Sequence, residues 1–255
     1  MASAGHPDWL RPDWDAPRVG ALMTTRAGGV SEGPFASMNI RGGLGDDSSA
    51  VAQNQAIFAA AIGAKPVWLN QVHGREVVQL TAEHVGTLPT ADASVCTEPG
   101  IACTVQVADC LPVLFAAPQG RGVAGAHAGW RGLSLGVLEA ALATLCDAAG
   151  CTPAQVQAWL GPCIGPRQFE VGADVLEAFG ADPAGPAHEF FVPHAPGKWL
   201  ADLAGLARHR LRQGGVSEIG GGAWCTVEDA SRFFSYRRDR LTGRMAAAIW
   251  LDRRQ

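Results

Sequence analysis

Three short segments each place a side chain that can bind a transition metal beside glycine or proline. Two of these side chains are histidines, His73 in Gln-Val-His-Gly and His127 in His-Ala-Gly-Trp-Arg-Gly, and the third is Cys110 in Ala-Asp-Cys-Leu-Pro. Two imidazoles and one thiolate are a suitable ligand set for a catalytic zinc ion, which keeps its fourth tetrahedral position for water or substrate. The residue types therefore point to a metal site made by His73, Cys110 and His127.

The spacing of these residues leaves two other interpretations open, because they lie too far apart in the chain to form a motif by themselves. Cys110 could be a small buried side chain, with both histidines hydrogen-bonded at the ends of strands. Cys110 could also be a nucleophile that His127 activates as a general base.

The composition excludes several classes of protein. The chain has 255 residues, of which 47% are hydrophobic and 17% charged, so it is not a disordered tail protein. A formal net charge of -4 argues against binding nucleic acid. No uncharged stretch is long and apolar enough to span a bilayer, and the N-terminus lacks the pattern of a secretory signal. Seven cysteines without a C-x-x-C pair indicate reduced thiols, and we expect a cytoplasmic protein.

Strands and helices mix along the chain without regular βαβ alternation, and the three metal-binding candidates fall in loops or at strand ends. The pattern predicts one α/β-type domain over residues 1–255, with an irregular arm over 1–18. Strands are predicted at 19–23, 67–69, 77–80, 101–107, 111–116, 123–127, 156–160, 223–226 and 245–251. Helices are predicted at 51–61, 135–149, 172–179 and 199–213, the first capped by Asp47 or Ser48 and ended by Gly63. Two Gly-rich segments, 26–31 and 41–47, are predicted to form tight turns.

Several longer strings occur in an order that resembles one known family. They are Thr-Arg-Ala-Gly-Gly-Val-Ser (25–31), Gln-Val-His-Gly (71–74), Ala-Asp-Cys-Leu-Pro-Val (108–113), His-Ala-Gly-Trp-Arg-Gly (127–132), Leu-Gly-Pro-Cys-Ile-Gly-Pro (160–166) and Phe-Phe-Ser-Tyr-Arg-Arg-Asp (233–239). The order resembles the YfiH/DUF152 family, once called laccase-like or multicopper polyphenol oxidase, and the resemblance spans residues 17 to 251.

The resemblance implies a fold, a metal site and an activity. The fold would be a single-domain α/β (α+β) sandwich of mixed β-sheets flanked by helices. The metal ligands would be His73, Cys110 and His127, and the activity that of a zinc-dependent purine nucleoside phosphorylase, with adenosine deamination at the same site. The implied partners are a small-molecule nucleoside and phosphate, with no nucleic acid, membrane or obligate protein partner.

Two alternatives stay open at this point. One is an amidase that edits a UDP-MurNAc-linked peptidoglycan precursor carrying a wrong amino acid, which is the function assigned to one branch of the family. The other is a copper-dependent polyphenol oxidase, which we favour less because only His73 and His127 fall in matching motifs, whereas a multicopper site needs many histidines.

Phosphorolysis also needs groups that bind phosphate and move protons. Arg26 is our first candidate for binding phosphate or ribose, because the adjacent glycines could add backbone amides to the same anion. Arg131 follows His127 closely and is the second candidate. Asp109 precedes Cys110 and could transfer protons or orient a ligand histidine. Arg237 or Arg238 could reach the site from the C-terminal segment.

Overall fold

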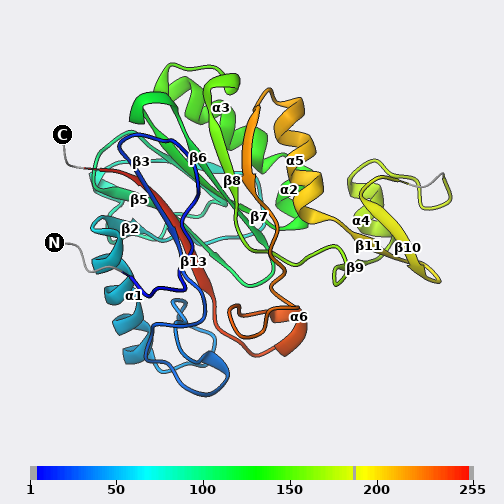
Figure 1. Ribbon diagram of the computed structural model, residues 1–255, viewed down its shortest axis with the longest axis horizontal. Helices are drawn as coiled ribbons and strands as arrows, with labels where there is room; N and C mark the ends of the chain where they lie inside the picture. Colours follow the sequence, from blue (N-terminus) through cyan, green and yellow to red (C-terminus); the bar gives the residue numbers. More distant parts are fainter. Residues whose placement is uncertain (1–4, 186–187, 253–255) are drawn as a thin grey trace.

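The longest apolar segments form the centres of two β-sheets that pack face to face in the computed structural model, which describes residues 5–185 and 188–252 (Figure 1). The four-stranded sheet has the order β1 (Val19–Met23), β13 (Met245–Leu251), β5 (Ile101–Val107), β2 (Lys65–Val67). The six-stranded sheet has the order β12 (Glu218–Gly221), β8 (Gln157–Leu160), β6 (Leu111–Ala116), β7 (Val123–Ala128), β4 (Ala93–Cys96), β3 (Val77–Leu80). Both sheets mix parallel and antiparallel pairs.

The two faces of each sheet are buried against different partners. In β13, Ile249 packs into the core between the sheets, whereas its neighbour Trp250 packs on the outer side against α1 (Ser48–Ile62). The other face of the six-stranded sheet is covered by α3 (Val137–Ala149) and α5 (Leu203–Gln213). This double burial explains why the central strands are continuously apolar rather than alternating.

Helix ends follow the sequence signals closely. The carboxylate of Asp47 accepts hydrogen bonds from the backbone N–H groups of Ser49 and Ala50, so Asp47 is the N-cap of α1. Gly63 ends the same helix with φ 64°, a left-handed conformation that glycine adopts without strain.

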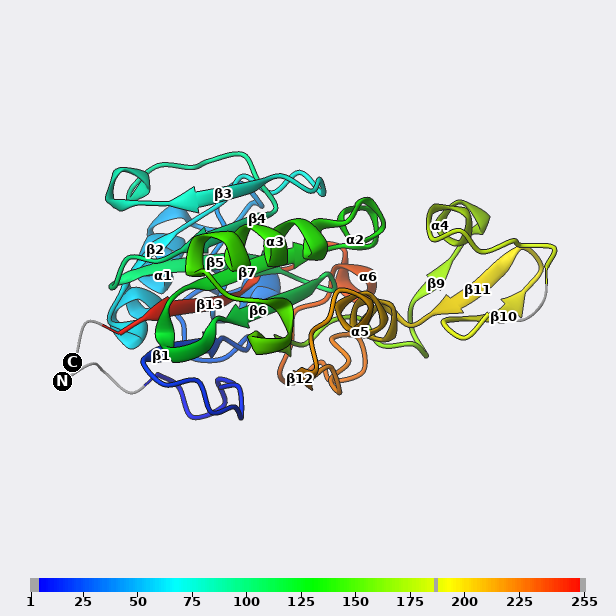
Figure 2. The ribbon, with the colours of Figure 1, turned by 90° about the horizontal axis from the view of Figure 1, so that it is seen from above.

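A third, smaller sheet projects from the body of the molecule. Its order is β10 (Phe191–Ala195), β11 (Lys198–Ala201), β9 (Glu170–Val171), and α4 (Ala173–Ala178) packs beside β9. Figure 2 shows this unit standing apart from the two main sheets, joined to them at α5. Two shorter helices, α2 (Trp130–Leu135) and α6 (Tyr236–Asp239), lie between the projecting unit and the body.

The predicted mixed α/β fold with sheets flanked by helices is confirmed, with four local corrections. The strand predicted at 223–226 is wrong, because the edge strand of the six-stranded sheet forms at 218–221 instead. Within 223–226, Cys225 makes an isolated bridge with Cys163. The helix predicted from residue 199 begins at Leu203, since Lys198–Ala201 pairs as β11. The strand predicted at 67–69 forms at 65–67. The helix from residue 135 is two helices separated at Gly136, where φ is 92°.

The described part of the arm at residues 5–18 contributes a single bridge, between Leu10 and Met23. None of the helices in the part of the chain that the structure describes has the length and apolar character needed to cross a membrane.

Candidate metal centre and its cavities

The fold brings His73, Cys110 and His127 together at one end of the two sheets. His73 lies in the loop between β2 and β3, Cys110 in the turn by which the chain passes from β5 to β6, and His127 within β7. One ligand atom from each of the three residues lies within 4.8 Å of the others. The Sγ of Cys110 is 3.8 Å from Nε2 of His73, and the two imidazole rings meet edge to face with centroids 4.8 Å apart. The three residues therefore form a group that could hold a metal ion.

A buried carboxylate that the sequence analysis did not single out orients both histidines. Asp92 is fully buried, directly before β4. Its Oδ1 lies 2.8 Å from Nδ1 of His127, which leaves Nε2 of that ring for a metal. The same carboxylate accepts the backbone N–H of His73 at 2.9 Å, together with those of Val72 and Gly74. These bonds hold the loop at His73 in its left-handed conformation, with φ 60°.

Close backbone approach also shapes the group. A Cβ atom at Gly129 would lie 2.8 Å from Cδ2 of His73 and 3.1 Å from the Sγ of Cys110. A Cβ atom at Gly132 would lie 2.8 Å from the carbonyl oxygen of Gly74. The glycines of the His-Ala-Gly-Trp-Arg-Gly string are thus needed for the three ligands to converge.

Cys110, His127 and Asp92 shift one another's pKa values toward their charged forms. Burial opposes ionisation of Cys110, but the positive charge of His127 and hydrogen bonds from both histidines outweigh it and lower the pKa of the thiol to about 6. Burial would lower the pKa of His127, yet the Cys110 thiolate and Asp92 raise it to about 9. Asp92 behaves similarly: burial would raise its pKa, but hydrogen bonds from His127 and Gly74 lower it. Because metal binding needs the thiolate, this charge pattern prepares Cys110 as a ligand at neutral pH.

Two cavities meet at this group, and His73, Cys110 and Tyr236 line both. The first, of about 260 Å³, is walled by apolar and aromatic side chains, and we call it the aromatic cavity. The second, of about 320 Å³, holds two arginines and two glutamines, and we call it the basic cavity. The aromatic cavity is also lined by Ala108, Asp109, Gly129, Trp130, Arg131, Ile164, Phe169, Leu203 and Arg237. The basic cavity is also lined by Arg41, Leu44, Gln71, Gln106, Val107, Ala108, His127 and Arg244.

Of the other predicted site residues, Asp109 and Arg131 line the aromatic cavity. Asp109 has φ 90°, and its carboxylate accepts hydrogen bonds from Oγ1 of Thr226 at 2.6 Å and from the backbone N–H of Arg237 at 2.7 Å. The hydrogen bond to the ring of His127 comes from Asp92, and both roles considered for Asp109 stay predictions. The guanidinium of Arg131 is exposed and lies 4.3 Å from the ring centroid of Trp130.

Arg26 lies elsewhere. Its guanidinium donates to the backbone carbonyls of Ala36 at 3.1 Å and Ala230 at 2.9 Å, and it lines neither cavity. Arg238 is likewise engaged, by Asp239 and by backbone carbonyls that include that of Thr226. The phosphate-binding role of Arg26 stays a prediction. The two arginines of the basic cavity, Arg41 and Arg244, were not identified from the sequence.

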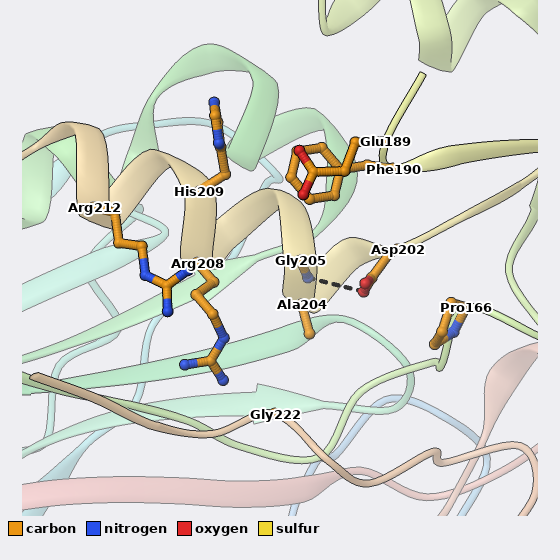
Figure 3. Close-up of a pocket in the computed structure, with 10 residues that line it drawn as sticks. All are labelled: Pro166, Glu189, Phe190, Asp202, Ala204, Gly205, Arg208, His209, Arg212 and Gly222. Carbon is orange, nitrogen blue, oxygen red and sulfur yellow. Dashed lines mark hydrogen bonds between the residues drawn. The ribbon is translucent and has the colours of Figure 1, made fainter. Parts of the chain in front are cut away.

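A further cavity, of about 360 Å³, lies beside α5 and contains none of the predicted site residues (Figure 3). Its lining combines Arg208, His209 and Arg212 of α5 with the acidic residues Glu189 and Asp202.

Comparison with known proteins places this arrangement in a family. Residues 20–252 match the family described as multi-copper polyphenol oxidoreductase laccase. The chain is 49% identical to the purine nucleoside phosphorylase PA4543 of Pseudomonas aeruginosa, over 96% of this chain and 98% of that one. It is also 49% identical to the purine nucleoside phosphorylase YfiH of Escherichia coli, over 94% and 97%. A solved Neisseria meningitidis structure of the DUF152 family is 46% identical, with a TM-score of 0.89 over 96% of this chain and 99% of that chain.

The fold and the sequence are thus those of a laccase-like α/β protein. Within that class, the chain belongs to the multi-copper polyphenol oxidoreductase laccase family, also known as YfiH/DUF152, as the order of its sequence motifs predicted.

Proposed function

We propose that the protein is a zinc-dependent purine nucleoside phosphorylase that acts in the cytoplasm. The observation that carries this proposal is the position of the His73–Cys110–His127 group between an aromatic cavity and a basic one. Phosphorolysis of a nucleoside needs such a pair, because an aromatic base and a phosphate anion must meet at one reacting carbon. The names of the relatives from P. aeruginosa and E. coli support the same activity.

The donor set supports zinc rather than copper. One thiolate and two imidazoles match catalytic zinc sites, and only two histidines belong to the group, which is too few for a multicopper centre. A zinc ion held by His73, Cys110 and His127 would supply a Lewis acid that polarises an oxygen of the substrate. Asp92 would fix the ring of His127 through its hydrogen bond to Nδ1.

The chain's own side chains bind and orient the reactants in this proposal. Trp130 and Phe169 form the aromatic wall against which the purine stacks. A phosphate oxygen forms a bond to C1′ of the ribose, the C1′–N9 bond breaks, and the base leaves with the electron pair of that bond and takes up a proton. Asp109, held by Thr226 and Arg237 beside the cluster, is our candidate for assisting that proton transfer.

Chromatographic analysis of the products from adenosine, with and without phosphate, tests this function. We expect the zinc-loaded protein to form adenine and ribose 1-phosphate only when phosphate is present. Cys110→Ser should lower the rate at least about 1000-fold, with thermal stability measured in parallel as a control for folding.

Two other results would contradict phosphorolysis and identify a different reaction. Inosine formed without phosphate would indicate deamination at the same cluster. Release of an amino acid from a UDP-MurNAc-linked precursor, with no reaction on nucleosides, would favour the editing amidase.

A further inference from the structure

The basic cavity brings two arginines together without a carboxylate among its lining residues. Arg41 and Arg244 both line it, and none of its lining residues is an aspartate or glutamate. Among the ion pairs found in residues 5–185 and 188–252, none involves either arginine. Burial, and then the positive charge of Arg41, lower the pKa of Arg244, and the smaller opposing effects of Cys110 and Asp109 do not outweigh them. Two like charges held in one half-buried space repel each other, and a bound anion between them relieves that repulsion.

A buried side chain builds this arrangement from two distant parts of the chain. The side-chain oxygen of Asn39, which is fully buried, accepts the backbone N–H of Arg41 at 3.2 Å and that of Arg244 at 2.9 Å. The backbone N–H of Ile40 also donates to the carbonyl of Arg244 at 3.2 Å. The side-chain amide of Asn39 donates to Asp46, which fixes the far end of the Gly-rich segment 41–47. Hydrogen bonds to their backbone groups therefore hold Arg41 and Arg244 beside each other.

The cavity beside α5 also contains two arginines, Arg208 and Arg212, but it has acidic side chains as well. There, the guanidinium of Arg208 donates to the carbonyls of Ile219 at 2.7 Å and Gly221 at 2.8 Å, and Figure 3 shows it turned toward the segment at Gly222. Glu189 and Asp202 line the same space and supply negative charge. For the two arginines of the basic cavity, the side-chain hydrogen bonds within the described part of the chain involve Nη1 of Arg244, which donates to the carbonyls of Thr242 and Gly243 in its own turn. The guanidinium of Arg244 also lies 5.8 Å from the ring centroid of Tyr236.

We infer that Arg41 and Arg244 bind the phosphate that takes part in the reaction, next to His127 and Cys110 and on the side of the cluster away from the purine. Arginine suits this role because its planar guanidinium can donate two parallel hydrogen bonds to phosphate oxygens. This inference rests on the proposed phosphorolysis, but the anion site itself does not require it. The Gly-rich segment 41–47 supplies the site by carrying Arg41 and Leu44 to the wall of the cavity.

Three variants of the zinc-loaded protein test the inference: Arg41→Met, Arg244→Met, and Arg212→Met as the matched control. The control removes an exposed arginine from the cavity beside α5. We expect each of the first two variants to raise the KM for phosphate about 10- to 100-fold, because a charge-assisted hydrogen bond is lost. The KM for adenosine should change less than about twofold. Arg212→Met should match the wild type in both constants, and Arg244→Lys should recover part of the phosphate affinity.

Calorimetric titration of inorganic phosphate into the same proteins separates failure of this inference from failure of the proposed function. If the wild type binds phosphate and both Met variants bind it more weakly, the anion site stands even when no phosphorolysis occurs. If the wild type cleaves adenosine with phosphate but the Met variants bind phosphate as it does, the inference is wrong and the function stands. The inference would also be wrong if the Met variants raised the KM for adenosine as much as the KM for phosphate, or if the wild type did not bind phosphate. Circular dichroism of each variant shows whether it is folded.

Discussion

The aromatic cavity and the basic cavity share four residues, His73, Ala108, Cys110 and Tyr236, yet are built in different ways. The aromatic cavity takes its walls from the start of α2, from the base of the projecting unit and from α6, as Trp130, Phe169 and Tyr236 show. The basic cavity takes its walls from strands of the central sheets and from two chain segments that Asn39 joins. The difference suggests that packing defines the space for the base, whereas hydrogen bonds define the space for the anion.

The largest expected effect concerns the group that the two cavities share. Asp92→Asn removes the negative charge that orients His127 and the loop at His73, while preserving the shape of the side chain. We expect the affinity for zinc to fall about 10- to 100-fold, as is usual when a hydrogen-bond partner of a metal ligand is lost. Competition with a chromophoric chelator measures this affinity. The cluster borders both cavities. At limiting zinc, the rate should therefore fall by the same factor whether adenosine or phosphate is the reactant held at saturation.

Asp92→Glu serves as a control that restores the charge but lengthens the side chain. An unchanged zinc affinity in a folded Asp92→Asn protein would show that the hydrogen bond to Nδ1 of His127 does not position the ring.

The next prediction concerns the aromatic cavity alone. Phe169→Ala removes an aromatic wall, and a stacked base contributes about 1–3 kcal/mol per aromatic side chain. We expect the KM for adenosine to rise about 5- to 50-fold with the KM for phosphate unchanged. Arg41→Met is expected to do the opposite, raising the KM for phosphate alone. Steady-state kinetics with each reactant varied in turn provides the measurement. A rise in both constants after either substitution would remove the division between the cavities.

The smallest effect is expected in the reactivity of Cys110. In the metal-free protein, alkylation of Cys110 should rise through a midpoint near pH 6, since the thiolate forms as pH rises past its lowered pKa. At pH 7 the rate should exceed that of an ordinary thiol only a few-fold, because a thiolate of lower pKa is also less nucleophilic. Peptide mapping by mass spectrometry follows Cys110 apart from the other cysteines, and Cys103, whose pKa burial raises, is an internal control.

Charged and neutral reagents sharpen the comparison further. The ratio of the alkylation rate with iodoacetate to that with iodoacetamide should be higher at Cys110 than at an ordinary thiol, because Arg41 and Arg244 attract the anion. Arg244→Met should lower this ratio. A midpoint near pH 8.5 in the wild type would contradict the charge pairing between Cys110 and His127.

Much of the fold could be predicted because the central strands are apolar on both faces. The segments at 101–107 and 111–116 carry this signal, and the structure has strands there. The projecting sheet was missed because it has no such pattern: in β10 only Phe191 is buried, and Pro193 interrupts the segment. The strand at 218–221 consists of one glutamate, one isoleucine and two glycines, so neither alternation nor apolar content marked it.

At the candidate site, residue type singled out the three side chains that the fold brings together, but not the residues that hold them in place. Histidine and cysteine beside glycine are visible in the sequence, whereas Asp92 is one of many aspartates until the fold brings His127 next to it. Arg26 was a candidate because glycines follow it, and in the structure its Nε and Nη1 donate to backbone carbonyls. Arg41 and Arg244 are far apart in the chain, and it is the fold that brings them together, through Asn39 and the backbone bond between Ile40 and Arg244. Sequence proximity to glycine therefore could not show which arginines line the two cavities.

The turn at Cys110 has a consequence for how the protein would acquire the proposed metal ion. This turn is the point where the chain leaves the four-stranded sheet and enters the six-stranded one, and His127 comes from the strand next to β6 in the second sheet. His73 reaches the same point from the loop between β2 of the first sheet and β3 of the second. A chain whose sheets have formed but not yet docked would therefore lack a complete ligand set. Metal capture would mark the last stage of folding, and metal present in the cell would trap molecules that have completed it.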